Sequence, residues 1–295
     1  MELAVTPFNV NSIRELSENG ADIFIIGNKQ FANRLANSFS LEKIIEANEI
    51  IKLLKKKIYV NLNLIIHNID LNNVKEFLKY IKKLNVDGII FGDLAIFQLA
   101  KEMDLVNKLI YNPETLNTNY YDPVYWSNKG ILGLTISKEI TLEDISIIAK
   151  NSKIEISLIG HGYLNMFHSK RPLIENFLKY TNNEYDNYIE NRNLRLVEEI
   201  RDEAYPIFQD SHGTHIFRAK SMESFKEVNI LKKMIEIFII DGIFKDTNYL
   251  IKTLKNYKTL LSSTSNKEKA LEISKQYEKD HDSGFLYKKT VYVKY

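Results

Sequence analysis

Residues 21–68 decide the fold. They begin with a short apolar run, "ADIFIIG" (21–27), continue through a helical stretch, "SLEKIIEANEIIKLLKKK" (40–57), and end in a second apolar run, "IYVNLNLIIHN" (58–68). Strand-length apolar runs that alternate with helix-length patterns are typical of parallel strands covered by helices. Ser40 stands where a helix N-cap is preferred, and lysines occupy the last turn of the predicted helix. The stretch therefore predicts one strand–helix–strand unit.

The same alternation continues along most of the chain. The predicted strands are 2–7, 21–27, 58–68, 86–93, 108–117, 131–137, 153–162 and 235–243, and a last helix covers 247–262. Most of these runs are apolar on both faces, as expected for parallel strands between helices. The units predict an α/β protein with a closed (β/α)8 barrel of the TIM type. An open doubly wound sheet is the alternative, although no glycine-rich phosphate loop follows the first strand.

The chain is longer than a plain barrel requires. Between the seventh and eighth strands, at about 168–230, "NLRLVEEI", "YPIFQD" and "GTHIFRA" read as short antiparallel strands. They predict a small β insertion over the top of the barrel. We therefore expect 1–263 to form the barrel with this insertion, and 264–295 to form a C-terminal helix and tail that dock on the barrel.

Composition limits the classes of function. The 295-residue chain is 44% hydrophobic and 26% charged, and its net charge of +2 is too small to indicate nucleic acid by itself. No apolar stretch reaches the ~18–20 residues of a membrane span, and the first residues show no leader pattern. We therefore expect a cytoplasmic protein without a membrane partner. The absence of cysteine excludes disulfides, thiolate nucleophiles and cysteine-ligated iron–sulfur clusters.

Polar side chains gather where the predicted strands end. In a TIM-type barrel the carboxyl ends of the strands carry the functional residues, so we expect a pocket there. Ordinary loop polarity is the competing explanation. The candidates are Asn63 after the third strand, Asn112 and Glu114 after the fifth, Glu139 after the sixth, His161 after the seventh and Asp241 after the eighth.

The stretch 159–173, "IGHGYLNMFHSKRPL", follows the seventh strand and is dense in polar groups. Arg171 offers a planar fork that matches a carboxylate or phosphate, with Lys170 beside it, and Arg34 is a second candidate contact for an anion. An isolated surface position is the competing explanation for each arginine. Ser169 and Lys170 raise the alternative of a nucleophile–base pair, but adjacent residues face apart.

Several histidines lie near the seventh unit, and with a neighbouring carboxylate they raise the hypothesis of a metal site. These histidines are His161, His168, His212 and His215. His212 and His215 are three apart on a predicted strand and so point to opposite faces, and no helical HExxH spacing occurs. We therefore expect no metal here, and His215 is kept as a candidate substrate contact.

Longer motifs occur together and in order along the chain. They include "GNKQFANRLANSFSLEKI", "NPETLNTNY", "IGHGYLNMFHSKRPL" and "RDEAYPIFQDSHGTHIF". In combination they resemble the peptidase U32 family, the collagenase-like proteases, from about residue 25 to the end. The chain looks closest to the shorter of two subfamilies in Gram-positive bacteria. The resemblance implies hydroxylation of the wobble uridine of tRNA to 5-hydroxyuridine, with prephenate as co-substrate and with tRNA and a paired U32 paralogue as partners.

The chain departs from the family at one kind of position. Many relatives hold cysteines that help to ligate an iron–sulfur cluster where this sequence has Asn165 and Pro172, and a third lies near Glu223. We therefore expect no bound cluster in this chain.

The resemblance and the polar residues together predict a site. Its catalytic groups would be Glu114, His161 and Asn63, and its anion or substrate contacts Arg34, Lys170, Arg171, Asn112, Glu139, His215 and Asp241. Two other functions stay open. One is a U32 collagenase-like peptidase, and the other is a non-catalytic subunit of a paired U32 complex.

Overall fold

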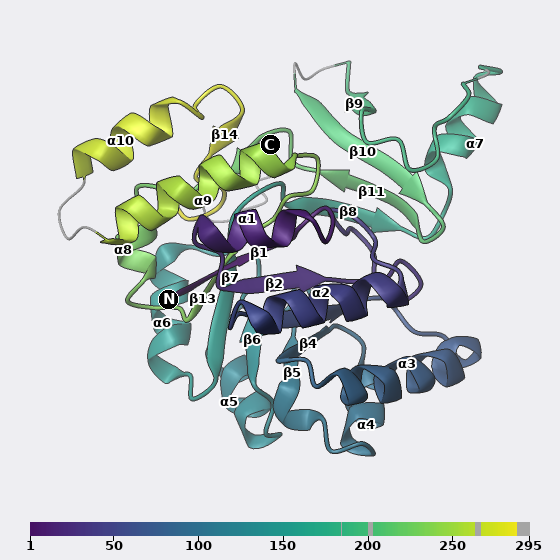
Figure 1. Ribbon diagram of the computed structural model, residues 1–295. Coiled ribbons are helices and arrows are strands. Elements are labelled where there is room, and N and C mark those ends of the chain that lie inside the picture. The colour runs from purple at the N-terminus through teal and green to yellow at the C-terminus, as the bar shows by residue number, and fades with distance from the viewer. Residues whose placement is uncertain (184, 200–202, 263–266, 288–295) are drawn as a thin grey trace.

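A computed structural model describes residues 1–183, 185–199, 203–262 and 267–287. Its centre is a closed barrel of parallel strands in the order β1-β13-β7-β6-β5-β4-β3-β2 (Figure 1). The barrel strands are β1 (Glu2–Val5), β2 (Ile23–Ile26), β3 (Lys57–Leu62), β4 (Gly88–Phe91), β5 (Leu109–Tyr111), β6 (Gly133–Thr135), β7 (Glu155–His161) and β13 (Ile237–Ile240). The predicted TIM-type barrel is confirmed.

Strand β2 shows why the barrel strands are apolar on both faces. Ile23 and Ile25 point into the barrel and join an inner apolar cluster, whereas Phe24 and Ile26 join the outer cluster under the helices. Successive side chains of a strand face opposite sides, so a strand between an inner core and a helical layer buries every residue. All four residues of β2 are buried.

Helices cover the outside of the barrel. They are α1 (Ser12–Glu18), α2 (Leu41–Leu53), α3 (Leu71–Leu84), α4 (Leu94–Lys101), α5 (Tyr121–Asn128), α6 (Leu142–Asn151), α8 (Val228–Leu231), α9 (Thr247–Ser262) and α10 (Lys267–Lys275), with short 3-10 helices η1 (Asn68–Asp70) and η2 (Val106–Lys108). Ser40 caps α2 by accepting the Lys43 backbone N–H at 3.3 Å, as its position predicts. Thr141 caps α6 in the same way through the Asp144 N–H.

The insertion between β7 and β13 is an antiparallel sheet in the order β8-β11-β10-β9. Its elements are β8 (Asn165–Ser169), β9 (Arg195–Val197), β10 (Ala204–Asp210), β11 (Gly213–Phe217) and the helix α7 (Leu173–Tyr180). The sheet lies across one end of the barrel, with α7 at its outer edge (Figure 1). The sheet begins at Asn165, earlier than the predicted start at 168, because Asn165 and Phe167 of β8 already pair with β11.

The described part of the C-terminal segment contacts the barrel layer. Strand β14 (His281–Asp282) pairs in parallel with β12 (Ser221–Met222), and the Leu286 carbonyl accepts the Leu142 N–H at 3.0 Å. The Tyr287 hydroxyl donates to Glu227 at 2.8 Å. The last part of the predicted tail, 288–295, lies outside the described residues.

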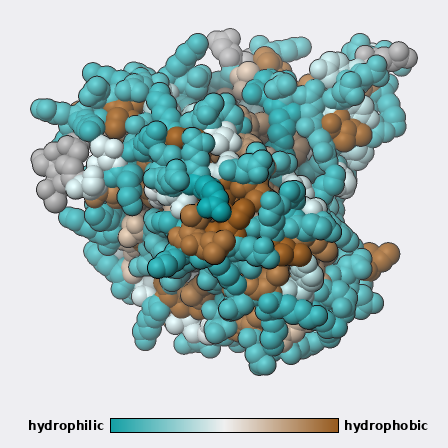
Figure 2. All heavy atoms as spheres, viewed as in Figure 1, coloured by the Kyte–Doolittle hydropathy of each residue, from teal (hydrophilic) through white to brown (hydrophobic). Residues whose placement is uncertain are grey.

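The face in Figure 2 is largely hydrophilic, with apolar side chains gathered near its middle, around β2 and α2. Within the described ranges, no helix is both long enough and apolar enough to cross a membrane.

Candidate functional site

A pocket opens where the carboxyl ends of the barrel strands meet the insertion sheet. Its outer part measures about 320 Å³, and inner lobes of about 80 Å³ and about 60 Å³ adjoin it. Arg34 and Asn112 line all of these parts, so they form one continuous region, here called the mouth pocket. The insertion sheet contributes Asn165 from β8 and Phe217 from β11.

The mouth pocket brings together part of the predicted site. The predicted side chains that line it are Arg34, Asn63, Asn112, Glu114 and Asp241. They come from loops after β2, β3, β5 and β13, so residues distant in sequence converge because parallel strands share one carboxyl end.

The most strongly charged part of the pocket is an ion triple. The Arg34 guanidinium contacts one carboxylate oxygen of Glu114, and the Lys138 ammonium lies 3.6 Å from the other. The three side chains are only 11%, 23% and 7% exposed, respectively. Buried charges that are paired interact more strongly than surface pairs, but each becomes costly once its partner is removed.

The ion triple sets the charge of its members. Burial by itself raises the pKa of Glu114, but Arg34 and Lys138 more than offset this, so the pKa lies below its ordinary value. Burial lowers the pKa of Lys138, and the nearby Glu114 carboxylate opposes that shift. Glu114 therefore stays ionised at neutral pH.

The backbone at both ends of the Arg34–Glu114 contact is strained. Arg34 has a φ of +52° and Glu114 a φ of +69°, a left-handed conformation that costs a non-glycine residue about 1–3 kcal/mol. Two asparagines hold these loops: Asn63 Oδ1 accepts the Asn33 N–H at 2.9 Å, and Asn112 Oδ1 accepts the Glu114 N–H at 3.1 Å. Asn63 and Asn112 thus position the ion triple.

Asp241 forms a second acidic position, at the end of β13. Its Oδ1 accepts the Thr6 hydroxyl at 3.1 Å and the Ile243 N–H at 3.0 Å. Burial raises the pKa of Asp241 despite these hydrogen bonds and despite the attraction of Arg192. The pocket therefore holds one carboxylate that is kept ionised and one that protonates more readily.

The backbone of His161 adjoins the mouth pocket, since its carbonyl accepts the Asp241 N–H at 2.8 Å, but its side chain does not line the pocket. Its ring is fully buried, with Nδ1 3.1 Å from the Tyr257 hydroxyl and Nε2 2.6 Å from the Tyr249 hydroxyl. The Tyr249 hydroxyl is also 2.6 Å from His281 Nε2, and His281 Nδ1 faces the Tyr277 carbonyl at 3.2 Å. The structure therefore does not bring this predicted catalytic residue to the other candidates.

The carbonyl at one end of this network determines the direction of every hydrogen bond. His281 Nδ1 must donate to the Tyr277 carbonyl, so His281 Nε2 accepts from Tyr249. The Tyr249 oxygen then accepts from His161 Nε2, and His161 Nδ1 accepts from Tyr257. Every donor meets an acceptor only when both histidines are neutral. Burial lowers the pKa of both, that of His281 to about 4.

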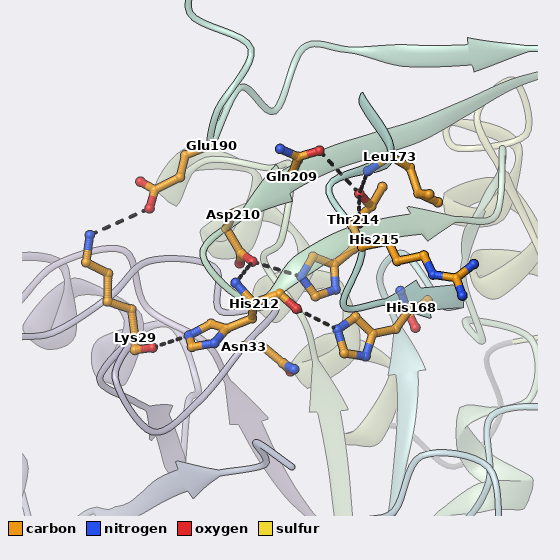
Figure 3. Close-up of polar contacts among 12 residues, drawn as sticks. Lys29, Asn33, His168, Leu173, Glu190, Gln209, Asp210, His212, Thr214 and His215 are labelled. Atoms are coloured by element: carbon orange, nitrogen blue, oxygen red, sulfur yellow. Dashed lines mark hydrogen bonds and ion pairs between the residues drawn. The ribbon is translucent and has the colours of Figure 1, made fainter. Parts of the chain in front are cut away.

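His168, His212 and His215 lie close together (Figure 3), and His168 lines the outer part of the pocket. His215 Nε2 lies 3.2 Å from Asp210, and the His215 ring stacks on that of His168 at 4.7 Å. Contrary to the prediction, His212 stands in the turn before β11 and not on a strand, and it contacts the Lys29 carbonyl. Within the described part of the chain, no group of three or more histidine or acidic residues could hold a metal ion.

The other predicted anion contacts lie at the rim or outside the pocket. Lys170 is exposed and its ammonium contacts the His67 ring, next to the outer part of the pocket. Arg171 and Glu139 are exposed and do not line the mouth pocket. Ser169 Oγ accepts the Arg171 N–H at 3.2 Å, so Ser169 and Lys170 do not form a nucleophile–base pair.

The residues at the cysteine positions of relatives do not fit an iron–sulfur cluster. Asn165 donates its amide to the carbonyls of Phe167 and Ile216, and Glu223 accepts from Ser274 and from the backbone. The chain has no thiolate to offer at any position.

The sequence prediction missed Lys138. It lies three residues after the end of β6, next to Glu139, which stood out as a polar residue at a strand end. Lysine is abundant in this chain, so a single lysine does not by itself indicate a functional residue. Its position after a buried strand could have marked it, as it marked Glu139.

Comparison with known proteins matches residues 8–292 to peptidase family U32. The chain is 33% identical to tRNA hydroxylation protein P2 of Bacillus subtilis, and the alignment covers 99% of both chains. It is 26% identical to an uncharacterized protease of Methanocaldococcus jannaschii (98% of this chain, 73% of that one). It is 23% identical to tRNA hydroxylation protein P1 of Bacillus subtilis (89% and 63%). The chain therefore belongs to the peptidase U32 family.

Proposed function

We propose that this chain is a cytoplasmic protein that takes part in tRNA hydroxylation, and that its target is the wobble uridine, which becomes 5-hydroxyuridine. The observation that carries this proposal is the 33% identity to tRNA hydroxylation protein P2 over 99% of both chains. A match over the full length leaves no large part of either protein without a counterpart.

The proposed co-substrate is prephenate, which carries two carboxylates. The mouth pocket supports a dicarboxylate because it holds two buried cations, Arg34 and Lys138, in one place. An arginine fork and a lysine ammonium are the side chains that bind carboxylates most strongly. In the ligand-free protein Glu114 occupies both cations, so a ligand carboxylate has to compete with it.

The proposal is tested in a strain that lacks this gene and any paralogue able to replace it. Mass spectrometry of tRNA nucleosides should show loss of 5-hydroxyuridine and its derivatives. Wild-type protein should restore them and Arg34→Ala should not, whereas Lys79→Ala, on an exposed helix face, should restore them fully. Unchanged wobble modification in the deletion strain would refute the function.

A second candidate is a non-catalytic subunit of a paired U32 complex. It is favoured by the observation that two tRNA hydroxylation proteins of one bacterium, P1 and P2, both match this chain. A purely structural subunit does not need the ion triple. Restoration of tRNA modification by a folded Arg34→Ala variant would therefore favour the subunit over the first proposal.

The peptidase function has no comparable support. Hydrolysis of a peptide bond needs an activated nucleophile or a metal-bound water. Ser169 and Lys170, which were considered as a nucleophile–base pair, are engaged with other groups.

A further inference from the structure

We propose that the inner part of the mouth pocket is a binding site for a pyrimidine base, the uracil ring of a uridine that is flipped out of the anticodon loop, and that Asn61 reads its edge. The inference rests on the proposed function, because it names where the target base of that reaction binds.

Both inner lobes have an apolar lining. The smaller lobe is lined by Ile25, Ile90 and Ile239, which belong to the inner apolar cluster. The larger lobe is lined by Tyr163 and Phe217, and Ile159 lines both lobes. Enzymes that act on a flipped base hold its two apolar faces between aromatic or aliphatic side chains. A flat ring between these apolar side chains satisfies this requirement.

The polar side of the same lobes is made of asparagines. Asn61 lies on β3 between Val60 and Leu62, which point outward to the helices, so its own side chain points into the barrel. It lines both inner lobes. Asn63 and Asn112 line the larger lobe together with Asn61, but their Oδ1 atoms already accept backbone N–H groups.

Asn61 has an unmet acceptor at this place. Its Oδ1 is buried, and no hydrogen-bond partner for it occurs among the described residues. Buried polar atoms in folded proteins nearly always have a partner, so an orphaned one at a pocket wall indicates a ligand or water. The N3–H of uracil is a matching donor, and the Asn61 amide N–H can donate to the neighbouring carbonyl of the ring. Asparagine binds base edges in this paired way.

The placement also brings the base to the proposed co-substrate. Arg34 lines the inner lobes and the outer cavity alike, so an anion held by Arg34 and a base held by Asn61 are neighbours. The C5 atom of uracil is not used by the hydrogen bonds to Asn61. It therefore stays open to the co-substrate.

The test measures binding of two RNA hairpins that copy an anticodon stem-loop, one with uridine and one with an abasic residue at the wobble position. Wild-type protein should bind the uridine hairpin roughly tenfold more tightly, the range of one stacked and hydrogen-bonded base. Asn61→Leu should reduce this ratio severalfold, because the hydrogen bonds are lost and the apolar contacts stay, and it should leave the salt dependence of binding unchanged because phosphate contacts remain.

Asn48 provides a matched control. Like Asn61, it has a buried Oδ1 without a partner among the described residues, but it lies on α2 and donates to the Leu84 carbonyl at 3.1 Å. Asn48→Leu should keep the full uridine preference and lower the melting temperature. Asn61→Leu should not lower it, because an apolar side chain there replaces an unsatisfied polar atom. Asn61→Ala serves if the leucine does not fit.

The outcomes separate the base site from the proposed function. Equal affinity of the wild type for both hairpins, or a full uridine preference in both Asn61 variants, overturns the base site but leaves tRNA as the substrate. Absence of binding to either hairpin overturns the base site together with direct contact to tRNA. The nucleoside measurement in the deletion strain decides the function independently of these results.

Discussion

Replacing Glu114 by glutamine should weaken the fold and strengthen binding of an anionic ligand. The substitution removes one negative charge and keeps the size of the side chain. Arg34 and Lys138, whose side chains are 11% and 7% exposed, then lose their shared partner. Glu114 thus acts as an internal competitor for the ligand carboxylate.

The expected loss of stability follows from the geometry. A charge pair at about 4 Å interacts by about 4 kcal/mol at an effective dielectric constant of about 20. Breaking a buried pair by removing one member costs about 3–5 kcal/mol. For a chain of this size, a loss of about 3 kcal/mol corresponds to a fall in melting temperature of roughly 5–10 °C.

Ligand affinity should change in the opposite direction. A charge-assisted contact to a carboxylate contributes about 1.5–3 kcal/mol, and the variant no longer displaces Glu114 to form it. Affinity for prephenate should therefore rise by about tenfold or more. Thermal denaturation with and without prephenate, together with titration calorimetry, measures both effects. Ligand at about 100 times its Kd should restore about 2.7 kcal/mol of stability.

The matched comparison is Arg34→Ala, which removes a ligand contact and should weaken prephenate binding. If Glu114→Gln also weakens it, Glu114 contacts the ligand directly and the competition argument is wrong. An unchanged melting temperature in Glu114→Gln would mean that the ion triple contributes no stability.

Three further predictions follow from the structure. Unfolding free energy should fall as pH drops from 6.5 toward 4, because the unfolded chain then protonates His161 and His281 while the folded chain keeps them neutral. Denaturant titrations at several pH values check this, and the dependence of the unfolding free energy on pH should become weaker in His281→Gln. Arg171→Ala should change prephenate affinity by less than about twofold, as an exposed charge does; a loss in calorimetry equal to that of Arg34→Ala would place the anion at Arg171. Purified protein should contain no stoichiometric iron, because it has no cysteine; elemental analysis that finds bound iron would contradict this.

The barrel was predictable because its pattern is local. β2 and β3 flank a capped amphipathic helix, and each segment shows its type within its own residues. Repetition of that unit leaves a closed barrel as the compact arrangement. The positions of polar residues at strand ends were predictable for the same reason, since a parallel sheet brings all carboxyl ends to one side. This accounts for Asn63, Asn112, Glu114 and Asp241, whereas Arg34 was predicted from its guanidinium as a contact for an anion.

The sequence alone could not show which of the polar residues at strand ends line the pocket and which are buried elsewhere in the fold. His161 ends β7 as Asp241 follows β13, yet its ring turns to Tyr249 and Tyr257, which lie on α9 far along the chain. Lys138 looked like one lysine among many until the fold placed it at Glu114. The direction of a side chain at a strand end depends on how that strand pairs with its neighbours and on which residues pack against it. Both are set by segments that are distant in the sequence.

The sequence by itself therefore determined the fold class and the family, which depend on local periodicity and on ordered motifs. Only the tertiary structure decided which charges meet, which histidines are buried with both ring nitrogens hydrogen-bonded, and that β8 pairs with β11. The physical reason is distance along the chain. The hydrophobic pattern of a strand or helix is visible within that segment alone. Arg34, Glu114 and Lys138, in contrast, meet only after the barrel closes.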